Sequence, residues 1–197
     1  SLFLSFDISE PSKGFTSDDI TVSGGELTQF QSSSDVKFSA TFTPSNYGAT
    51  TVNINADVFT DTLGNTNKSS EVFSWYFDNT SPSISSVSLA ADNSSIVVSF
   101  SENVFNTASG SGALEVSDFA LSVSGGTATL ASATPTAIVQ NGNSYTLSFS
   151  LTGTPDGSEV ISVAPIANSV YDGSGNLAST TQAKGSGKLM DQASPSI

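Results

Sequence analysis

The candidate functional side chains in this sequence are carboxylates and amides in predicted loops. Their oxygen atoms are potential ligands for Ca²⁺. Six such residues belong to the second half of the chain or to the segment that leads into it, namely Asp78, Asn79, Glu102, Asp118, Asp172 and Asn176. Ca²⁺ accepts about six to eight oxygen ligands without strict geometry, so several loops can share one ion. We therefore expect a Ca²⁺ site where these loops meet the connecting segment.

Three residues of the first half hold the equivalent positions, namely Glu10, Asp19 and Asp61. A second interpretation needs no metal. Asp61 and Asp172 each begin an Asp-x-x-Gly-Asn segment, and a carboxylate in such a loop can accept hydrogen bonds from backbone N–H groups. Both interpretations stay open, and calorimetric titration with Ca²⁺ distinguishes them.

Composition removes most enzymatic chemistry. The 197 residues include no cysteine and no histidine, which excludes thiol nucleophiles and the usual general base. We predict no enzyme, no catalytic residue and no organic cofactor. The 18 acidic and 5 basic residues give a net charge of −13. This charge repels phosphate and argues against nucleic acid and anionic membranes as partners.

An internal repeat divides the chain into modules. Residues 78–84 (DNTSPSI) return as residues 191–197 (DQASPSI), and Ser81 and Ser194 are 113 residues apart. A period of this length suits one β-sandwich per repeat. We predict one domain over residues 1–79, a second over 80–192, and the start of a following repeat at 193–197.

Alternating apolar and polar residues predict an all-β fold for both halves. In the second half, Gly125 and Gly126 suit a tight hairpin turn. The long loop 102–118 carries two of the candidate ligands. The seven predicted strands, which together make an immunoglobulin-like sandwich, are residues 84–90, 95–101, 119–124, 127–133, 144–151, 159–164 and 178–189.

The first half follows the same plan but lacks the opening strand, because residues 2–6 align with residues 97–100, the second strand of the other half. Either a boundary cuts through this module, or another chain supplies the strand by edge addition. Gly24 and Gly25 again predict a hairpin turn. The residues expected to face its core are Val36, Phe38, Ala40, Phe42, Val52, Ile54, Ala56, Phe73, Trp75 and Phe77.

Residues 3–82 contain a series of short motifs, namely 9–11 (SEP), 14–16 (GFT), 18–22 (DDITV), 59–61 (FTD), 64–67 (GNTN) and 73–75 (FSW). Together these motifs resemble the bacterial Ig-like repeats of very large surface adhesins. The second half is similar to a sister type of repeat through residues 98–104 and 172–176. The resemblance implies two tandem Ig-like β-sandwiches in a secreted or surface protein whose repeats act as a stalk.

Our functional prediction is a spacer of a large bacterial extracellular adhesin, with neighbouring Ig-like repeats of the same chain as partners and Ca²⁺ stiffening the module junctions. It would not insert into a membrane. The alternative is a subunit of an extracellular filament or sheath, in which copies exchange strands. A carbohydrate-binding module is a third hypothesis, but its platform, the loop 102–118, contains a single aromatic residue, Phe105.

Overall fold

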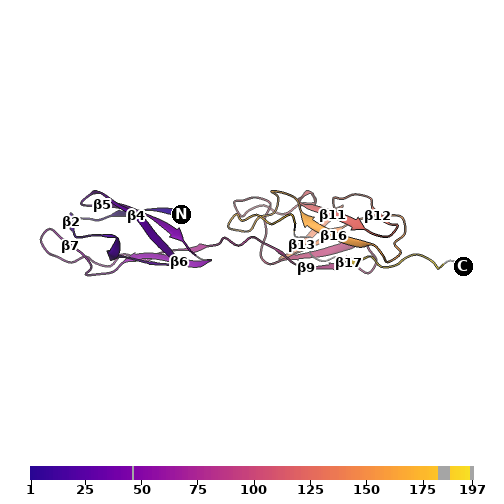
Figure 1. Cartoon of the computed structure of the whole chain (residues 1–197), viewed down its shortest axis with the longest axis horizontal. Coiled ribbons are helices and arrows are strands. Elements are labelled where there is room, and N and C mark those ends of the chain that lie inside the picture. The colour runs from indigo at the N-terminus through magenta and orange to yellow at the C-terminus, as the bar shows by residue number, and fades with distance from the viewer. Residues whose placement is uncertain (46, 182–186, 196–197) are drawn as a thin grey trace. The chain divides into compact units, whose positions relative to one another are not determined.

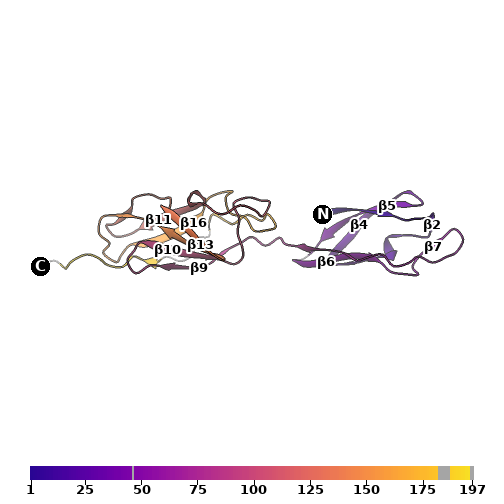
Figure 2. The same ribbon diagram turned by 180° about the vertical axis from the view of Figure 1, so that it is seen from behind.

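The computed structural model describes residues 1–45, 47–181 and 187–195. The chain divides into two compact units, Ser1–Asn79 and Thr80–Ile197, whose strands can be followed in Figure 1 and, from behind, in Figure 2. Each unit is a sandwich of small antiparallel sheets. The predicted all-β, Ig-like architecture is confirmed.

In the described part of the first unit, the strands form two three-stranded sheets and one short pair. The first sheet has the order β1 (Leu2–Asp7), β5 (Lys37–Pro44), β4 (Gly25–Ser34), and the second has the order β3 (Ile20–Ser23), β6 (Gly48–Ile54), β8 (Phe73–Phe77). The short pair joins β2 (Ser12–Lys13) to β7 (Thr60–Asp61), and a 3₁₀ turn, η1 (Ser17–Asp19), precedes β3.

Aromatic rings fill the core of the first unit. Phe15 is buried between the sheets, with ring centroids 4.8 Å from Phe38 and 4.9 Å from Phe59. Phe42 is completely buried and meets Trp75 edge to face at 4.9 Å. These contacts join β5 to the opposite sheet, so the apolar faces predicted for residues 38–42 and for Val52 do form this core.

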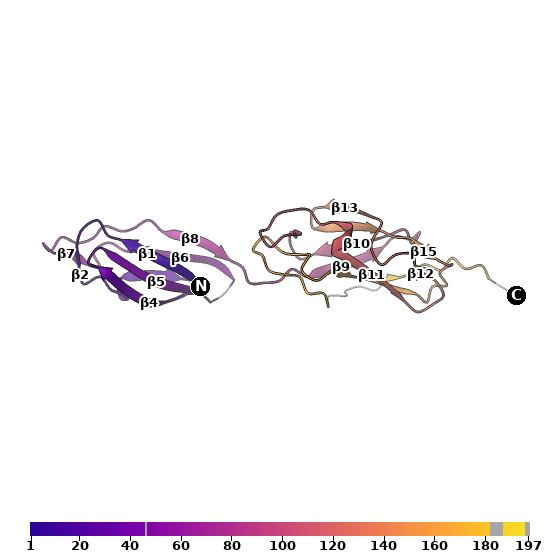
Figure 3. The same cartoon turned by 90° about the horizontal axis from the view of Figure 1, so that it is seen from above.

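The second unit adds one strand to the same plan. Its larger sheet has the order β13 (Ala137–Asn141), β14 (Ser144–Ser148), β10 (Ser95–Phe100), β9 (Ile84–Leu89). The opposite sheet has the order β11 (Phe119–Ser124), β16 (Val160–Pro165), β17 (Gly187–Lys188). A short pair joins β12 (Thr129–Leu130) to β15 (Leu151–Thr152), and η2 (Val116–Asp118) precedes β11. Figure 3 shows these strands from above.

The core of the second unit is more completely closed than that of the first. Ile96, Val98 and Leu147 are fully buried, and Tyr145 packs between Phe100 and Phe119 at centroid distances of 5.9 and 6.0 Å. The strand β9 contributes Ile84, which is also fully buried. The opening strand is therefore part of this core and does not merely line its edge.

The two predicted glycine hairpins are wrong. β3 ends at Ser23 but pairs with β6, while β4 begins at Gly25 and pairs with β5, so Gly24 carries the chain from one sheet to the other. β11 likewise pairs with β16 rather than with the segment after Gly126. Gly24 and Gly125 have positive φ values of 77° and 78°, which allow the chain to turn from one sheet to the other. A Cβ at Gly24 would lie 2.9 Å from the Ala49 carbonyl oxygen, which excludes larger residues.

Other strand predictions need correction. The predicted strand 127–133 contracts to β12, and the predicted strand 144–151 breaks after Ser148. β13 was not predicted, because an edge strand with little buried surface shows no clear alternation. Phe73 and Ala56 were expected in the core, but Phe73 is 55% exposed and Ala56 is also exposed. Of the predicted last strand, 178–189, residues 182–186 lie outside the described residues, and β17 covers only Gly187–Lys188.

Candidate metal-ligating loops

The Asp172 carboxylate organises the loop between β16 and β17. Oδ1 accepts hydrogen bonds from the backbone N–H groups of Ser174 and Asn176, both at 2.8 Å, and Oδ2 accepts one from Asn176 Nδ2 at 2.8 Å. The Asp172 residue is completely buried. Gly175 takes a φ of +87°, which lets the loop close tightly. Asp172 and Asn176, two of the predicted ligands, are thus brought together by this turn.

Asp61 builds the same loop in the first unit. Oδ1 accepts from the backbone N–H groups of Leu63 (2.8 Å) and Asn65 (2.9 Å), and Oδ2 accepts from Asn65 Nδ2 at 2.7 Å. The side-chain hydrogen bond from Asn65 is the main reason why the pKa of Asp61 lies below its ordinary value. The turn-building interpretation therefore describes the geometry of both Asp-x-x-Gly-Asn segments.

Asp19 and Asp118 occupy another pair of matching positions, at the ends of η1 and η2. Asp19 Oδ2 accepts a hydrogen bond from the Thr16 N–H at 2.8 Å, and Asp118 Oδ2 accepts one from the Glu115 N–H at 2.7 Å. Burial raises the pKa of Asp118, and the negative charge of Glu115 acts in the same direction. Both carboxylates stabilise the turn that leads the chain into a core strand.

The remaining predicted ligands are distributed between the units. A carboxylate oxygen of Glu102 and one of Asp172 lie within 4.8 Å of each other in the second unit. In the first unit, Glu10 and Asp61 line one hollow of about 480 Å³, which also includes Lys68. Asp78 and Asn79 are the last two residues of the first unit, and their participation in a shared calcium site stays a prediction.

Glu159 is a buried carboxylate that the sequence reasoning missed. Oε1 accepts hydrogen bonds from the N–H groups of Thr127 (3.0 Å) and Ala128 (2.9 Å), and Oε2 accepts one from Asp156 N–H at 3.1 Å. The Ala128 hydrogen bond is the largest cause that lowers the pKa of Glu159 to about 2. Glu159 thereby anchors the segment that crosses between the sheets.

Only long-range pairing could have revealed this role, because Glu159 lies 31 or 32 residues from Ala128 and Thr127. In the sequence, the local signal was the Gly125-Gly126 pair. In the structure, a Cβ at Gly126 would overlap the Glu159 carboxyl group. Thr50 of the first unit occupies the position that corresponds to Glu159: Thr50 lies next to Gly24, and Glu159 lies next to Gly126. The Thr50 hydroxyl donates to the Trp75 carbonyl oxygen at 2.9 Å.

These sheets and loops define an immunoglobulin-like all-β protein. Residues 1–75 match the family described as Bacterial Ig-like domain, and the first unit is an all-β sandwich. No curated protein and no solved structure matches the chain. Among the described residues, none lies in a helix with the length and hydropathy needed to cross a membrane.

Proposed function

We propose that this chain is a structural spacer segment of a large bacterial extracellular protein, with no catalytic activity of its own. The observation that carries the proposal is that each unit has its own hydrophobic core, built on closely similar sheet orders. The match of residues 1–75 to a Bacterial Ig-like domain supports an extracellular structural role. A spacer at the cell surface would hold a distal binding region away from the cell.

A spacer must keep its fold under load, and the loops described above suit that task. Carboxylates of Asp19, Asp61, Asp118, Asp172 and Glu159 are committed to backbone N–H groups. A charge-assisted hydrogen bond of this kind is stronger than a neutral one. It fixes turns that would otherwise open first. This use of the acidic residues explains how a chain without disulfides keeps its loops in place.

Single-molecule force spectroscopy tests the spacer proposal. Pulling the chain by its ends should give two separate unfolding events, one for each unit. At about 3.6 Å per residue, the 79 residues of the first unit correspond to an extended length of about 280 Å. The second unit corresponds to about 420 Å by the same measure. A single event that releases the whole chain would contradict the proposal.

We also keep calcium as a finer hypothesis for the second unit. The proximity of Glu102 to Asp172 favours it, because two neighbouring carboxylates repel each other unless a cation lies between them. Titration calorimetry with CaCl₂ on the whole chain should then show binding that Glu102→Gln abolishes. Glu10→Gln in the first unit is the matched control. An absence of binding heat, together with an unchanged melting temperature after chelation, would remove the hypothesis.

A further inference from the structure

The amide of Asn93 joins two segments of the second unit that lie far apart in the sequence. Its Nδ2 donates a hydrogen bond to the Met190 carbonyl oxygen, and its Oδ1 accepts one from the Met190 N–H, both at 2.8 Å. The two residues are 97 positions apart, and Asn93 is only 5% exposed. Burial strengthens such hydrogen bonds, because competing water is excluded. One side chain thus holds both backbone groups of Met190.

The backbone of Asn93 belongs to the turn between β9 and β10. Its N–H donates a hydrogen bond to the Ala90 carbonyl oxygen at 3.0 Å, and its φ is +57°. Glycine adopts this left-handed conformation without steric cost, and Asn is one of the few other residues that tolerate it. Glycine could form the turn but has no side chain to bind Met190. The amide of Asn93 therefore has a role beyond turn formation.

The contact between Asn93 and Met190 connects the two sheets of the second unit. Asn93 follows β9, an edge strand of the larger sheet, and Met190 follows β17, an edge strand of the opposite sheet. Figure 1 shows β9 and β17 next to each other. No backbone ladder joins the two sheets in the described part of this unit. The amide therefore links the sheets where strand pairing does not.

Two further hydrogen bonds hold residues 189–192, which we call the exit segment. The Leu189 N–H donates to the Glu159 carbonyl oxygen at 3.0 Å, and the Gln192 N–H donates to the Pro155 carbonyl oxygen at 2.9 Å. Both acceptors belong to β16 or to the loop that precedes it. The exit segment is thus bound to the β16 side by these two residues and to the β9–β10 turn by Asn93.

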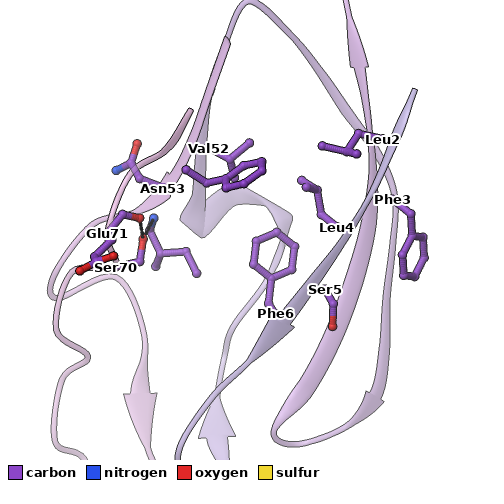
Figure 4. Close-up of a pocket in the computed structure, with 11 residues that line it drawn as sticks. Leu2, Phe3, Leu4, Ser5, Phe6, Val52, Asn53, Ser70 and Glu71 are labelled. Atoms are coloured by element: carbon purple, nitrogen blue, oxygen red, sulfur yellow. Dashed lines mark hydrogen bonds between the residues drawn. The ribbon is translucent and has the colours of Figure 1, made fainter. Parts of the chain in front are cut away.

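The last strand of the first unit is held in a different way. β8 pairs with β6 along all five of its residues, Phe73–Phe77. Before β8, the Ile54 N–H donates to the Ser70 Oγ at 2.9 Å, and Figure 4 shows Ser70 beside Asn53 at the end of β6. Among the described residues, β17 pairs with β16 at two positions. The described attachment of the last strand in the second unit therefore depends more on a side chain.

The direction of the strands determines how tension acts on the Asn93 contact. A Cβ on Gly187 of β17 would lie 3.0 Å from the Cβ of Leu89, the last residue of β9. Asn93 and Met190 meet a few residues further along both segments, so β9 and β17 run in the same direction. The chain enters β9 at Ile84 and leaves after the exit segment. Tension on the two ends would therefore slide these segments past each other and load both Asn93 hydrogen bonds together.

We propose that Asn93 sets the mechanical strength of the second unit, because its amide holds the exit segment against the β9–β10 turn when the chain is under tension. The proposal rests on the spacer function for the source of this tension, whereas the two hydrogen bonds are independent of it. Asn93 is a positioning residue in this role, since it acts on the backbone of Met190.

Asn93→Gly tests the proposal, because glycine keeps the left-handed turn and removes the amide. When the chain is pulled by its ends at constant force, the second unit should unfold about tenfold faster, as expected for two lost buried hydrogen bonds. The first unit should unfold at an unchanged rate. An unchanged rate for the second unit would overturn the proposal.

Asn168→Gly is the matched control in the same unit. Asn168 also has a positive φ, 58°, but it is exposed, and its amide makes no hydrogen bond within the described part of the chain. This variant should leave the unfolding rate under force unchanged. Equal acceleration in Asn93→Gly and Asn168→Gly would assign the effect to the turn backbone and would overturn the proposal.

A change of pulling direction separates mechanical strength from general stability. The chain has no cysteine, so introduced cysteine pairs define the attachment points. Ser81→Cys with Ala193→Cys pulls β9 against the exit segment, whereas Ser81→Cys with Val139→Cys pulls across the larger sheet and leaves the exit segment unloaded. Asn93→Gly should accelerate unfolding in the first direction and much less in the second. Equal acceleration in both directions would overturn the proposal.

Hydrogen exchange of the Met190 N–H measures the contact without tension. Asn93→Gly should make this amide exchange about tenfold faster, while the Leu121 N–H, which donates to the Ala133 carbonyl oxygen, should be unaffected. Equal Met190 exchange with and without the amide would overturn the proposal. Two unfolding events with an unchanged second-unit rate in Asn93→Gly would refute the role of Asn93 but leave the spacer function standing.

Discussion

Ile96 and Val98 of β10 are fully buried, whereas their counterparts in β1, Leu2 and Leu4, are 37% and 9% exposed. The residue types and the sheet position are closely similar. The difference comes from the neighbouring strand: β9 pairs with β10, and no described strand takes this place beside β1. Burial of an apolar strand in these sandwiches thus depends on the flanking strand as much as on the strand's own sequence.

A second difference lies at the crossing between the sheets. Thr50 of the first unit uses a neutral hydroxyl to bind a carbonyl oxygen, whereas Glu159 of the second unit uses a carboxylate to bind three N–H groups. At this matched position, the first unit therefore has a neutral hydroxyl that joins β6 to β8, whereas the second unit has a carboxylate that binds the segment after the crossing. Only the second arrangement responds to pH in the acidic range.

The largest expected difference in stability is between the matched strands β10 and β1. Ile96→Ala should lower the free energy of unfolding of the second unit by about 2–5 kcal/mol, because it leaves a cavity in a closed core. Leu2→Ala, at the matched position, should cost the first unit less than about 1.5 kcal/mol, since Leu2 is already partly exposed. Denaturant unfolding of each variant measures both values. Equal losses would show that the edge of β1 is not open in solution.

The next largest effect concerns the Asp-x-x-Gly-Asn loops. Asp172→Ala would leave two backbone N–H groups and one amide without their acceptor. It should destabilise the second unit by about 2–3 kcal/mol. Asp61→Ala should cost the first unit less, because water can replace a partly exposed carboxylate. Thermal unfolding measures the difference, and a larger loss for Asp61→Ala would contradict the role of burial.

A smaller effect tests the crossing glycines. Gly125→Ala places a side chain at a φ of +78° with its Cβ 2.8 Å from the Ser158 carbonyl oxygen. It should destabilise the second unit by about 1–2 kcal/mol. Gly142→Ala is a control with a positive φ of 59° but no neighbour within 4 Å. If both variants lose the same stability, strain alone and not the crossing contact explains the glycine.

The smallest expected effect at neutral pH concerns Glu159. Its pKa falls from an ordinary 4.5 to about 2 on folding. The stabilisation is therefore fully present above pH 4.5 and is lost as the pH falls through about 2. The melting temperature of the second unit should fall over this range, and Glu159→Gln should reduce its slope. An unchanged slope in this variant would show that the carboxylate does not anchor the crossing.

Local patterns predicted much of this structure and failed where pairing is decided at long range. The strand β11 has the bounds expected from alternation in residues 119–124. The Asp61 and Asp172 loops follow from residue types that cap backbone N–H groups within four positions. Gly24 and Gly125 also have local turn chemistry, but sheet pairing, which local sequence does not encode, makes them crossings.

The central claim is that two Ig-like units with separate cores form this chain. Differential scanning calorimetry of the whole chain with one core variant in each unit tests it most directly. Phe42→Ala and Leu147→Ala remove fully buried side chains from the first and second cores. We predict two transitions, with each variant lowering only the transition of its own unit. A single transition that both variants lower together would contradict the claim.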